Sequence, residues 1–329
     1  MKNILEVKGL KTYFHTFKGV VKAVDDVSFS LKAGEILGLV GESGGGKSVT
    51  GFSLIKLIEE PGKIEAGEII FDGTDIVKMS EREMSTIRGK EIAMIFQDPM
   101  TSLNPVYTIG KQMEEVLILH QSHLSKQERK ERCIELLTDV GISNPESRLK
   151  NYPHQFSGGM RQRVVIAIAL ACNPKLIIAD EPTTALDVTI QAQILKLMMK
   201  LVKDHNCALI LVTHDLAVVS EVADKINVMY CGKIVETGTR EDIMFNHVHP
   251  YTEGLIGSIP KLDRNQDRLE TIEGIVPNMF KLPKGCNFAP RCKHAQAICL
   301  EVEPESNSIG EKHHVACHHP VGGEKWNIS

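Results

Sequence analysis

The chain has 329 residues and the composition of an ordinary globular protein, with 42% hydrophobic and 24% charged residues. At about 150 residues per domain, this length predicts roughly two domains. The net charge of −4 lacks the basic character of nucleic-acid-binding domains, so DNA and RNA are not expected partners. No apolar run approaches the roughly 18 residues that span a bilayer and no signal-like segment opens the chain, so we expect a cytoplasmic protein.

The first predicted elements are short strands separated by turn residues, at 4–7, 20–24 and 27–31. The segment 67–73 continues this pattern as a strand that ends in a turn. Together they predict a small antiparallel β subdomain.

Residues 41–48, GESGGGKS, fill every fixed position of the phosphate-binding pattern G-x-x-x-x-G-K-[ST]. A strand-like apolar run precedes them and helix-compatible spacing follows, so the loop leads into a helix N-terminus. There, backbone N–H groups face a β-phosphate, Lys47 adds a point charge and the Ser48 hydroxyl can hold Mg²⁺. The residues predicted to contact the nucleotide are Gly41, Glu42, Ser43, Gly44, Gly45, Gly46, Lys47, Ser48 and Val49.

From about residue 100 to residue 163 the pattern changes to amphipathic helices, the clearest at 126–137, with breaks at Gly141 and Pro153. We interpret this region as an inserted helical subdomain. At its end, small residues at 157–159 precede an unbroken helical run, so they would lie at a helix N-terminus with outward-facing N–H groups. This is a second predicted phosphate site.

Strand and helix patterns then alternate, which predicts a parallel sheet covered by helices. The strands are expected at 175–179, 208–212 and 225–230, and a helix at 189–204. The first of these strands ends in two carboxylates. Because they accompany a phosphate loop, we expect Asp180 to reach Mg²⁺ and Glu181 to polarise the attacking water.

Six elements in a fixed order carry a family resemblance. Beyond the phosphate loop and the acid pair they are Gln97, Ser157-Gly158-Gly159, Asp187 and His214. The chain resembles the ATP-binding cassette subunit of an ABC transporter over about residues 1–240. The resemblance implies an α/β fold, a RecA-like P-loop cassette with antiparallel β and inserted helical subdomains, that hydrolyses ATP to ADP and phosphate.

The resemblance also implies the roles of individual residues. Glu181 would be the general base, His214 would bind the γ-phosphate and orient the water, and Gln97 would touch Mg²⁺ or the water. Mg²⁺ would be held by Ser48, Gln97 and Asp180. An aromatic ring near the start, Phe14 or the adjacent Tyr13, would stack on adenine.

A head-to-tail dimer is the further implication, with ATP between the phosphate loop of one cassette and the signature segment of the other. The signature residues acting across the dimer would be Ser157, Gly158, Gly159 and Met160, with Asp187 at the interface. The signature has Phe156 in place of leucine and Met160 in place of glutamine, yet the backbone N–H of Met160 could still serve a phosphate. The second cassette would be a paralogue, with an identical copy left open.

After about residue 240 periodicity fades, and we expect a C-terminal extension at 241–329. Its HPY tripeptide at 249–251 and the cysteine-bearing segment 286–292 are similar to the tail of cassette subunits in dipeptide, oligopeptide and nickel importers. The resemblance implies an energy-coupling ATPase peripheral to the cytoplasmic face of the membrane. Its partners would be two permease subunits and, indirectly, a solute-binding protein; its substrate would be a short peptide, or alternatively nickel or another small solute.

Four cysteines of the extension, Cys286, Cys292, Cys299 and Cys317, lie in a region with few apolar residues, where a staple is physically plausible. None of the gaps between these cysteines is the two-residue spacing typical of structural zinc sites. A zinc site and free thiols nevertheless remain alternatives. Four thiolates suit an iron–sulfur cluster, and the peptide-importer resemblance favours [4Fe-4S]. The remaining cysteines, at 133, 172, 207 and 231, fall in predicted helices and strands and are expected to be buried hydrophobes.

Two other classes of function fit less well. A soluble cassette ATPase acting on DNA or ribosomes usually has a coiled-coil insertion or two cassettes in one chain, and this sequence has neither. A P-loop kinase would leave the signature segment without a role.

Overall fold

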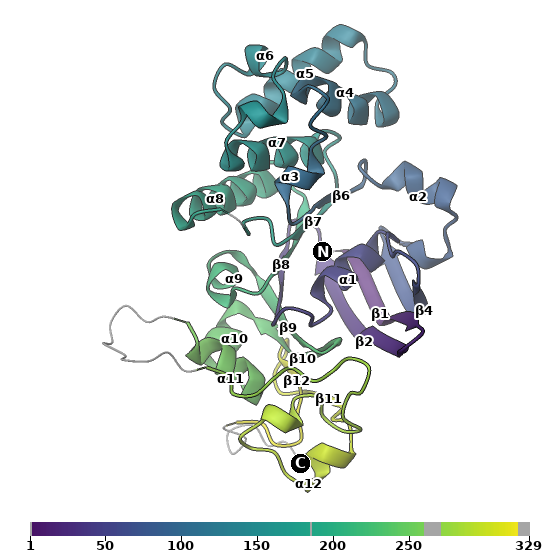
Figure 1. Ribbon diagram of the computed structural model, residues 1–329, viewed down its shortest axis with the longest axis vertical. Helices are drawn as coiled ribbons and strands as arrows, with labels where there is room; N and C mark the ends of the chain where they lie inside the picture. The colour runs from purple at the N-terminus through teal and green to yellow at the C-terminus, as the bar shows by residue number, and fades with distance from the viewer. Residues whose placement is uncertain (1, 185, 260–270, 322–329) are drawn as a thin grey trace. The chain divides into compact units, whose positions relative to one another are not determined.

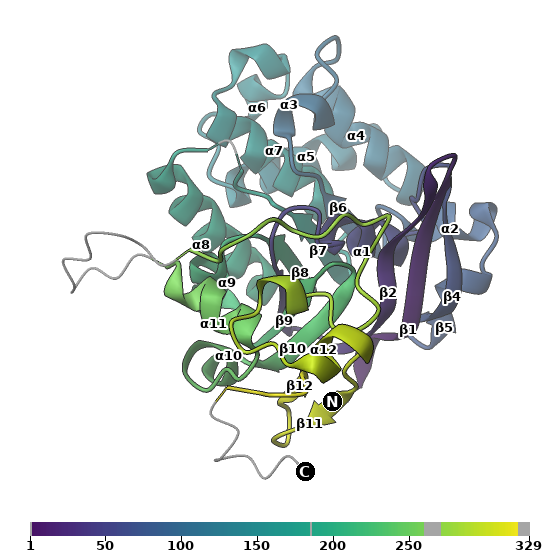
Figure 2. The same ribbon diagram turned by 60° about the horizontal axis from the view of Figure 1, so that its bottom comes forward.

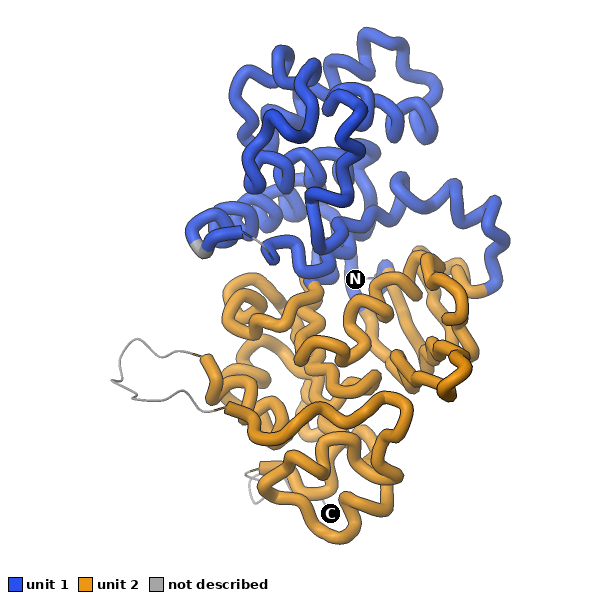
Figure 3. Tube along the Cα trace, in the orientation of Figure 1, with its two compact units in different colours: residues 1–4, 31–35, 78–211 blue, residues 5–30, 36–77, 212–329 orange. Residues whose placement is uncertain are grey.

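The computed structural model describes residues 2–184, 186–259 and 271–321 (Figure 1). The chain forms two compact units, coloured separately in Figure 3. Unit 1 contains residues 1–4, 31–35 and 78–211, and unit 2 contains residues 5–30, 36–77 and 212–329. Residues 260–270 and 322–329 of the predicted extension lie outside the described residues.

Unit 1 contains a parallel strand pair, β6 and β7, in which Met94 is opposite Ile178, and β8 lies beside β7. Its helices surround α7, which contacts α3, α4, α5, α8 and β6. Seven residues of α7 are buried, so this helix forms the core of the unit. The bounds are β6 Ile92–Ile95, β7 Leu176–Asp180, β8 Ala208–Thr213, α2 Glu81–Ile87, α3 Pro99–Ser102, α4 Ile109–His120, α5 Lys126–Asp139, α6 Pro145–Arg148, α7 Gly158–Leu170 and α8 Val188–Asp204, with a 3-10 turn at Pro153–Gln155.

Local sequence signals account for the ends of these helices. Helix α5 begins at a capping box in which Ser125 and Glu128 satisfy each other's backbone N–H groups, and α4 begins at Thr108, whose hydroxyl accepts from the Lys111 N–H. The predicted breaks at Gly141 and Pro153 fall between α5 and α7. The helical region from residue 100 onward therefore forms as the sequence indicates.

The first sheet of unit 2 has the order β2-β1-β4-β5 and contains the predicted antiparallel strands. Its bounds are β1 Asn3–Thr16, β2 Gly19–Lys32, β4 Gly62–Phe71 and β5 Thr74–Asp75. The sequence predicted two strands at 20–24 and 27–31, but β2 is one strand. Asp26 adopts a φ of 64° at the expected break, and the strand continues through it.

The second set of strands in unit 2 has the order β11-β12-β10-β9-β3. β3 and β9 are parallel, whereas β9 and β10 form an antiparallel pair. The bounds are β3 Ile36–Val40, β9 Lys225–Tyr230, β10 Lys233–Thr239, β11 Ser306–Ser308, β12 His314–Ala316, α1 Lys47–Leu54, α9 Leu216–Val222, α10 Arg240–Phe245, α11 Pro250–Gly257 and α12 Ala297–Glu301, with 3-10 turns at Ile76–Lys78 and Ala289–Arg291.

The described part of the extension belongs to the same unit as the phosphate loop. Its strand β12 pairs antiparallel with β10, where Val315 is opposite Glu236, and Figure 2 shows β12 beside β10. The carboxylate of Glu236, 1% exposed, accepts hydrogen bonds from the Val248 and His249 N–H groups. Its Oε1 also lies 2.8 Å from Nε2 of buried His313. A buried polar network thus fastens the extension to β10.

The four cysteines outside the extension are buried, as predicted. Only Cys133 lies inside a helix, however. Cys172 and Cys231 lie in turns that follow α7 and β9, and Cys207 immediately precedes β8. Burial raises the pKa of each of these thiols, which suits buried hydrophobes rather than reactive groups.

Candidate functional site

The phosphate loop lies between β3 and α1 of unit 2, as predicted. The side chain of Lys47 is buried, and its ammonium donates to the carbonyl oxygens of Gly41 at 2.8 Å and Glu42 at 2.9 Å. The Gly45 N–H donates to the same Glu42 carbonyl at 3.1 Å. The loop therefore folds around its lysine, while Ser43 and Gly44 are exposed at its crown.

Glycine is required at both ends of this loop. A Cβ at Gly41 would lie 2.0 Å from the carbonyl oxygen of Met229, and Gly46, with a φ of 97°, would place its Cβ 2.1 Å from the carbonyl oxygen of Ala23. Helix α1 follows Gly46 without a side-chain cap. An uncapped N-terminus suits a helix whose first N–H groups receive an anion. Ser48 and Val49, in its first turn, are half-buried.

The two aromatic candidates for adenine stacking have different surroundings on β1. The hydroxyl of Tyr13 donates to Asp25 at 2.5 Å, and the Lys22 ammonium lies 5.6 Å from the centre of its ring. Phe14 is half-buried, and its ring lies where a Cβ on Gly62 would be. The hydroxyl and one ring face of Tyr13 are thus already engaged.

The acid pair lies at the end of β7 in unit 1. Asp180 is buried, and Glu181 adopts a φ of 44°, a conformation that costs a non-glycine residue free energy and is common at functional sites. The carboxylate of Glu181 accepts from the Gln97 amide at 3.1 Å and from the Thr184 hydroxyl at 2.9 Å. The structure therefore brings together the predicted base and the predicted glutamine.

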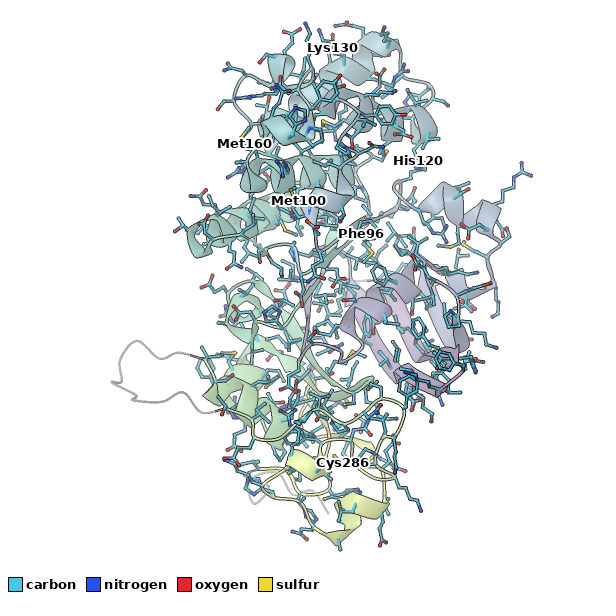
Figure 4. All side chains as sticks on the ribbon, in the orientation of Figure 1. Phe96, Met100, His120, Lys130, Met160 and Cys286 are labelled. Carbon is cyan, nitrogen blue, oxygen red and sulfur yellow. The ribbon has the colours of Figure 1, made fainter. Side chains whose placement is uncertain are left out.

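The signature segment opens α7, as the sequence indicates. The hydroxyl of Ser157 caps the helix by accepting from the Met160 N–H at 3.3 Å, and Ser157 and Gly158 are exposed. A Cβ at Gly159 would lie 2.8 Å from a methyl of Ile190, so the first turn of α7 packs closely on α8. Figure 4 labels Met160 at this helix start.

The remaining predicted residues lie at the starts of two helices. Asp187 caps α8 by accepting from the Ile190 N–H at 3.0 Å and is exposed. His214 is exposed after β8 and belongs to unit 2 with the phosphate loop. Gln97, the acid pair, the signature segment and Asp187 belong to unit 1.

Sequence reasoning missed two contacts on the phosphate loop. The Tyr251 hydroxyl accepts from the Glu42 N–H at 2.8 Å, and Arg291 donates two hydrogen bonds, of 2.6 and 3.0 Å, to the Glu42 carboxylate. Both residues lie in the tail segments that carry the resemblance to peptide importers. Those segments indicated the class of substrate, and nothing in the pattern linked them to Glu42.

The four cysteines of the extension line one small cavity of about 20 Å³, together with His249 and His319. Burial raises the pKa of Cys286 and Cys292, and that of Cys317 to about 12. Across the described residues, no group of three or more His, Cys, Asp or Glu side chains is arranged to hold a metal ion. The structure thus brings the four thiols to one cavity, but their side chains are not arranged as a ligand set for the iron–sulfur cluster or the zinc ion that the sequence suggested.

Two family models match the chain. The ABC transporter model matches residues 24–184, and the model for the C-terminal region of oligopeptide and dipeptide transporters matches residues 235–299. The first match includes the phosphate loop and the acid pair, and the second includes HPY and three of the four clustered cysteines.

Curated relatives match along nearly their whole length. The oligopeptide transport ATP-binding protein AppD of Bacillus subtilis is 53% identical over 305 residues, which are 92% of this chain and 93% of the relative. The dipeptide transport ATP-binding protein DppD of Escherichia coli is 48% identical over 318 residues, 97% of each chain.

Solved structures of ATP-binding cassettes share the fold. A dimeric cassette in a post-hydrolysis state, bound to ADP and phosphate, has a TM-score of 0.64 and 29% identity. It covers 72% of this chain and 98% of its own.

In the described residues, no helix has both the length and the hydropathy to cross a membrane.

Proposed function

The chain belongs to the ABC transporter family, and we propose that it is the ATP-hydrolysing, energy-coupling subunit of an importer for dipeptides or oligopeptides. The match of residues 235–299 to the C-terminal region of oligopeptide and dipeptide transporters carries the choice of substrate. A phosphate loop and an acid pair alone would fit transporters of many solutes, whereas this region accompanies peptide transport in relatives of about 50% identity.

The nucleotide chemistry rests on residues described above. Lys47 and the N–H groups at the start of α1 would bind the β- and γ-phosphates, and His214 would contact the γ-phosphate. Glu181 would take the proton of the attacking water as its oxygen bonds to the γ-phosphorus and ADP leaves. The hydrogen bond from Gln97 holds the Glu181 carboxylate in one orientation for that transfer.

The donors proposed for Mg²⁺ are oxygens, which this ion prefers: the Ser48 hydroxyl, the Asp180 carboxylate and the Gln97 amide. When bound, Mg²⁺ neutralises charge that develops on the transferred phosphoryl group. Asp180 is buried, as a carboxylate dedicated to a cation would be.

We infer a head-to-tail dimer in which Ser157, Gly158, Gly159 and Met160 of one chain cover the nucleotide of another. The dimeric form of the related cassette supports this inference. So does the N-terminus of α7, where small, exposed residues leave room for a phosphate near the first N–H groups. Asp187 would lie at this interface. The second cassette would be a paralogue or an identical copy.

The permease subunits would dock on unit 1, near α3, and the chain would then lie at the cytoplasmic face of the membrane. Large apolar side chains are exposed there, among them Phe96 and Met100, which are labelled in Figure 4. Val106 and Tyr107, which follow α3 in the sequence, are exposed as well, and exposed apolar side chains that gather in one patch mark interaction sites. A solute-binding protein outside the membrane would act through the permeases.

For the extension we propose a metal cofactor held by Cys286, Cys292, Cys299 and Cys317, a [4Fe-4S] cluster in preference to Zn²⁺. The support is that all four thiols line one cavity, which also has the His249 and His319 side chains at its border. Within the described residues, the buried Nε2 atoms of these two histidines have no hydrogen-bond partner. A bound cation would stabilise thiolates that burial otherwise disfavours. Chemical analysis of anaerobically purified protein should find iron and sulfide near four per chain, and stoichiometric zinc would contradict the cluster.

Reconstitution tests the transport function. The chain should co-purify with two polytopic membrane proteins, and proteoliposomes of that complex with its solute-binding protein should accumulate labelled dipeptides or oligopeptides only with ATP. The Lys47→Ala variant is the control for nucleotide dependence. Uptake of nickel ions alone would show that the proposed substrate is wrong. Co-purification with ribosomes or DNA would show that the proposed transport function is wrong.

A further inference from the structure

The C-terminal extension holds one residue of the phosphate loop, Glu42, by both its side chain and its backbone. Arg291 donates two hydrogen bonds to the carboxylate, at 2.6 and 3.0 Å, and the Tyr251 hydroxyl accepts from the backbone N–H at 2.8 Å. The residues lie 209 and 249 positions from Glu42 in sequence and in the same compact unit. The extension therefore contacts the loop directly.

Arg291 is fixed by more than its pairing with Glu42. Its side chain is 4% exposed, and it also donates to the carbonyl oxygens of Ile272 and Glu273. The Tyr230 hydroxyl lies 3.3 Å from the same guanidinium. A bidentate arginine–carboxylate pair is geometrically specific, and a buried one has little freedom to rearrange.

Glu42 transmits this constraint to the groups that meet phosphate. Its carbonyl oxygen accepts from the Lys47 ammonium at 2.9 Å and from the Gly45 N–H at 3.1 Å. A shift of the Glu42 peptide would therefore move the lysine and the turn of the loop together. The guanidinium also neutralises a carboxylate within a loop that must receive a polyanion.

We propose that Arg291 and Tyr251 are positioning residues for ATP binding, through which the C-terminal extension sets the affinity of the phosphate loop. This inference rests on the nucleotide site proposed above. It assigns the extension a role in the ATPase reaction itself, in addition to its association with peptide transport.

The test is a double-mutant cycle on the purified full-length chain, with equilibrium binding of a fluorescent ATP analogue in Mg²⁺ as the measurement. Arg291→Met should weaken binding about tenfold, because it leaves an unpaired carboxylate in the loop. Glu42→Gln should weaken it by only about twofold to threefold, since the amide retains hydrogen bonding without the charge. The double variant should bind nearly as well as Glu42→Gln alone, which is a rescue that a purely structural arginine would not give.

Two further variants provide a second test of the positioning role and a matched control. Tyr251→Phe removes only the hydroxyl and keeps the ring packed on Tyr230 and Phe288, so a loss of about threefold is expected. Arg129→Met, which breaks a part-buried pair with Glu114 in unit 1, is the matched control and should not alter ATP affinity. In the assembled transporter, the KM for ATP should rise in Arg291→Met while kcat changes little.

Lys47→Ala in the same assay separates this inference from the proposed nucleotide site. If Lys47→Ala binds ATP normally, the proposed site is wrong. If Lys47→Ala loses binding while Arg291→Met only lowers the melting temperature, the site stands and the positioning role is wrong. Should Arg291→Met fail to fold, unchanged affinity in both Tyr251→Phe and Glu42→Gln would also overturn it.

Discussion

The signature segment and the phosphate loop both precede a helix N-terminus that would receive phosphate, but they are stabilised in opposite ways. Helix α7 is capped by its own Ser157, three residues from the N–H that it satisfies. Helix α1 has no side-chain cap, and Tyr251 and Arg291 hold the loop before it. These two residues are 209 and 249 positions away from Glu42 in the sequence. One site is encoded locally and the other depends on a distant part of the chain.

This difference predicts how the two sites respond to change. A local cap can be lost or replaced with consequences for one helix only. A loop held through Glu42 responds to any change that moves the extension, even one far from the nucleotide. The expected effects below run from the largest to the smallest.

Glu181→Gln leaves both helix N-termini intact and should separate binding from turnover. ATP hydrolysis should fall by about 10²–10⁴-fold, because the amide cannot accept the proton of the attacking water. Equilibrium binding of ATP should stay within about twofold, and a stable ATP-bound dimer should be seen by size-exclusion chromatography. Undiminished phosphate release would show that another group is the base.

Mild acid should loosen the distant support while sparing the local one. Burial lowers the pKa of His249 to about 4 from an ordinary value near 6.5. Between pH 4 and pH 6.5 the folded state therefore binds fewer protons than the unfolded state. Stability is then lost as the pH falls from about 6.5 towards 4, by roughly 2 kcal/mol at pH 5 from this histidine. Burial acts to raise the pKa of Glu236, but its hydrogen bonds, that of His313 foremost, lower it overall, so this carboxylate adds a further loss of stability at lower pH.

Thermal unfolding at pH 7.5 and pH 5 measures this effect, with a decrease of a few degrees expected from the histidine. His249→Asn is the matched control, since asparagine can still cap α11 by accepting from the Tyr251 N–H, as His249 does. Between pH 7.5 and pH 5, the melting temperature of the His249→Asn variant should fall less than that of the unmodified protein, by the contribution of the histidine. An equal shift in both proteins would show that His249 is not responsible.

The adenine side of the phosphate-loop site can be tested at Phe14. Because the hydroxyl of Tyr13 is bonded to Asp25, we expect Phe14 to supply the stacking ring. Phe14→Ala should then weaken ATP binding about tenfold, a typical loss for base–aromatic stacking. Tyr13→Phe should change it less than twofold. The reverse ranking would assign the stacking to Tyr13.

The local site should show the smallest and most confined response. Ser157→Ala removes the α7 cap and should cost about 1 kcal/mol of stability, whereas Ser157→Asn should restore most of it. Neither variant should alter the ATP affinity of the isolated chain, since we propose that the signature acts across the dimer. A change in that affinity as large as the one expected for Arg291→Met would remove the contrast between the two sites.

The sequence predicted the elements that carry local signals. The phosphate loop, the strand ending in Asp180 and the helix that begins after Ser157 lie where their motifs placed them, because each motif contains its own turn or cap. The helix expected at 126–137 extends to Asp139, an ordinary error at a helix end. Residues 20–31 were divided in two because consecutive aspartates suggest a turn, although the strand continues through Asp26.

What could not be predicted depends on contacts between distant residues. The pairing of Arg291 with Glu42 produces no periodic pattern in the sequence. An arginine and a glutamate that are 249 positions apart could equally be two exposed, unrelated charges. Strands β11 and β12 have three residues each, too few to show alternation. The burial of Glu236 is also hidden, because its partners are backbone groups and a histidine far along the chain.

The pairing of β12 with β10 also bears on how this protein could be divided. A fragment ending at residue 240 would uncover the part of β10 that pairs with Val315 and His314, and an open strand edge of this kind can pair with other chains. It would also leave the Glu236 carboxylate without its His249 and His313 neighbours. We therefore expect such a fragment, although it contains every cassette motif, to self-associate more readily than the full chain.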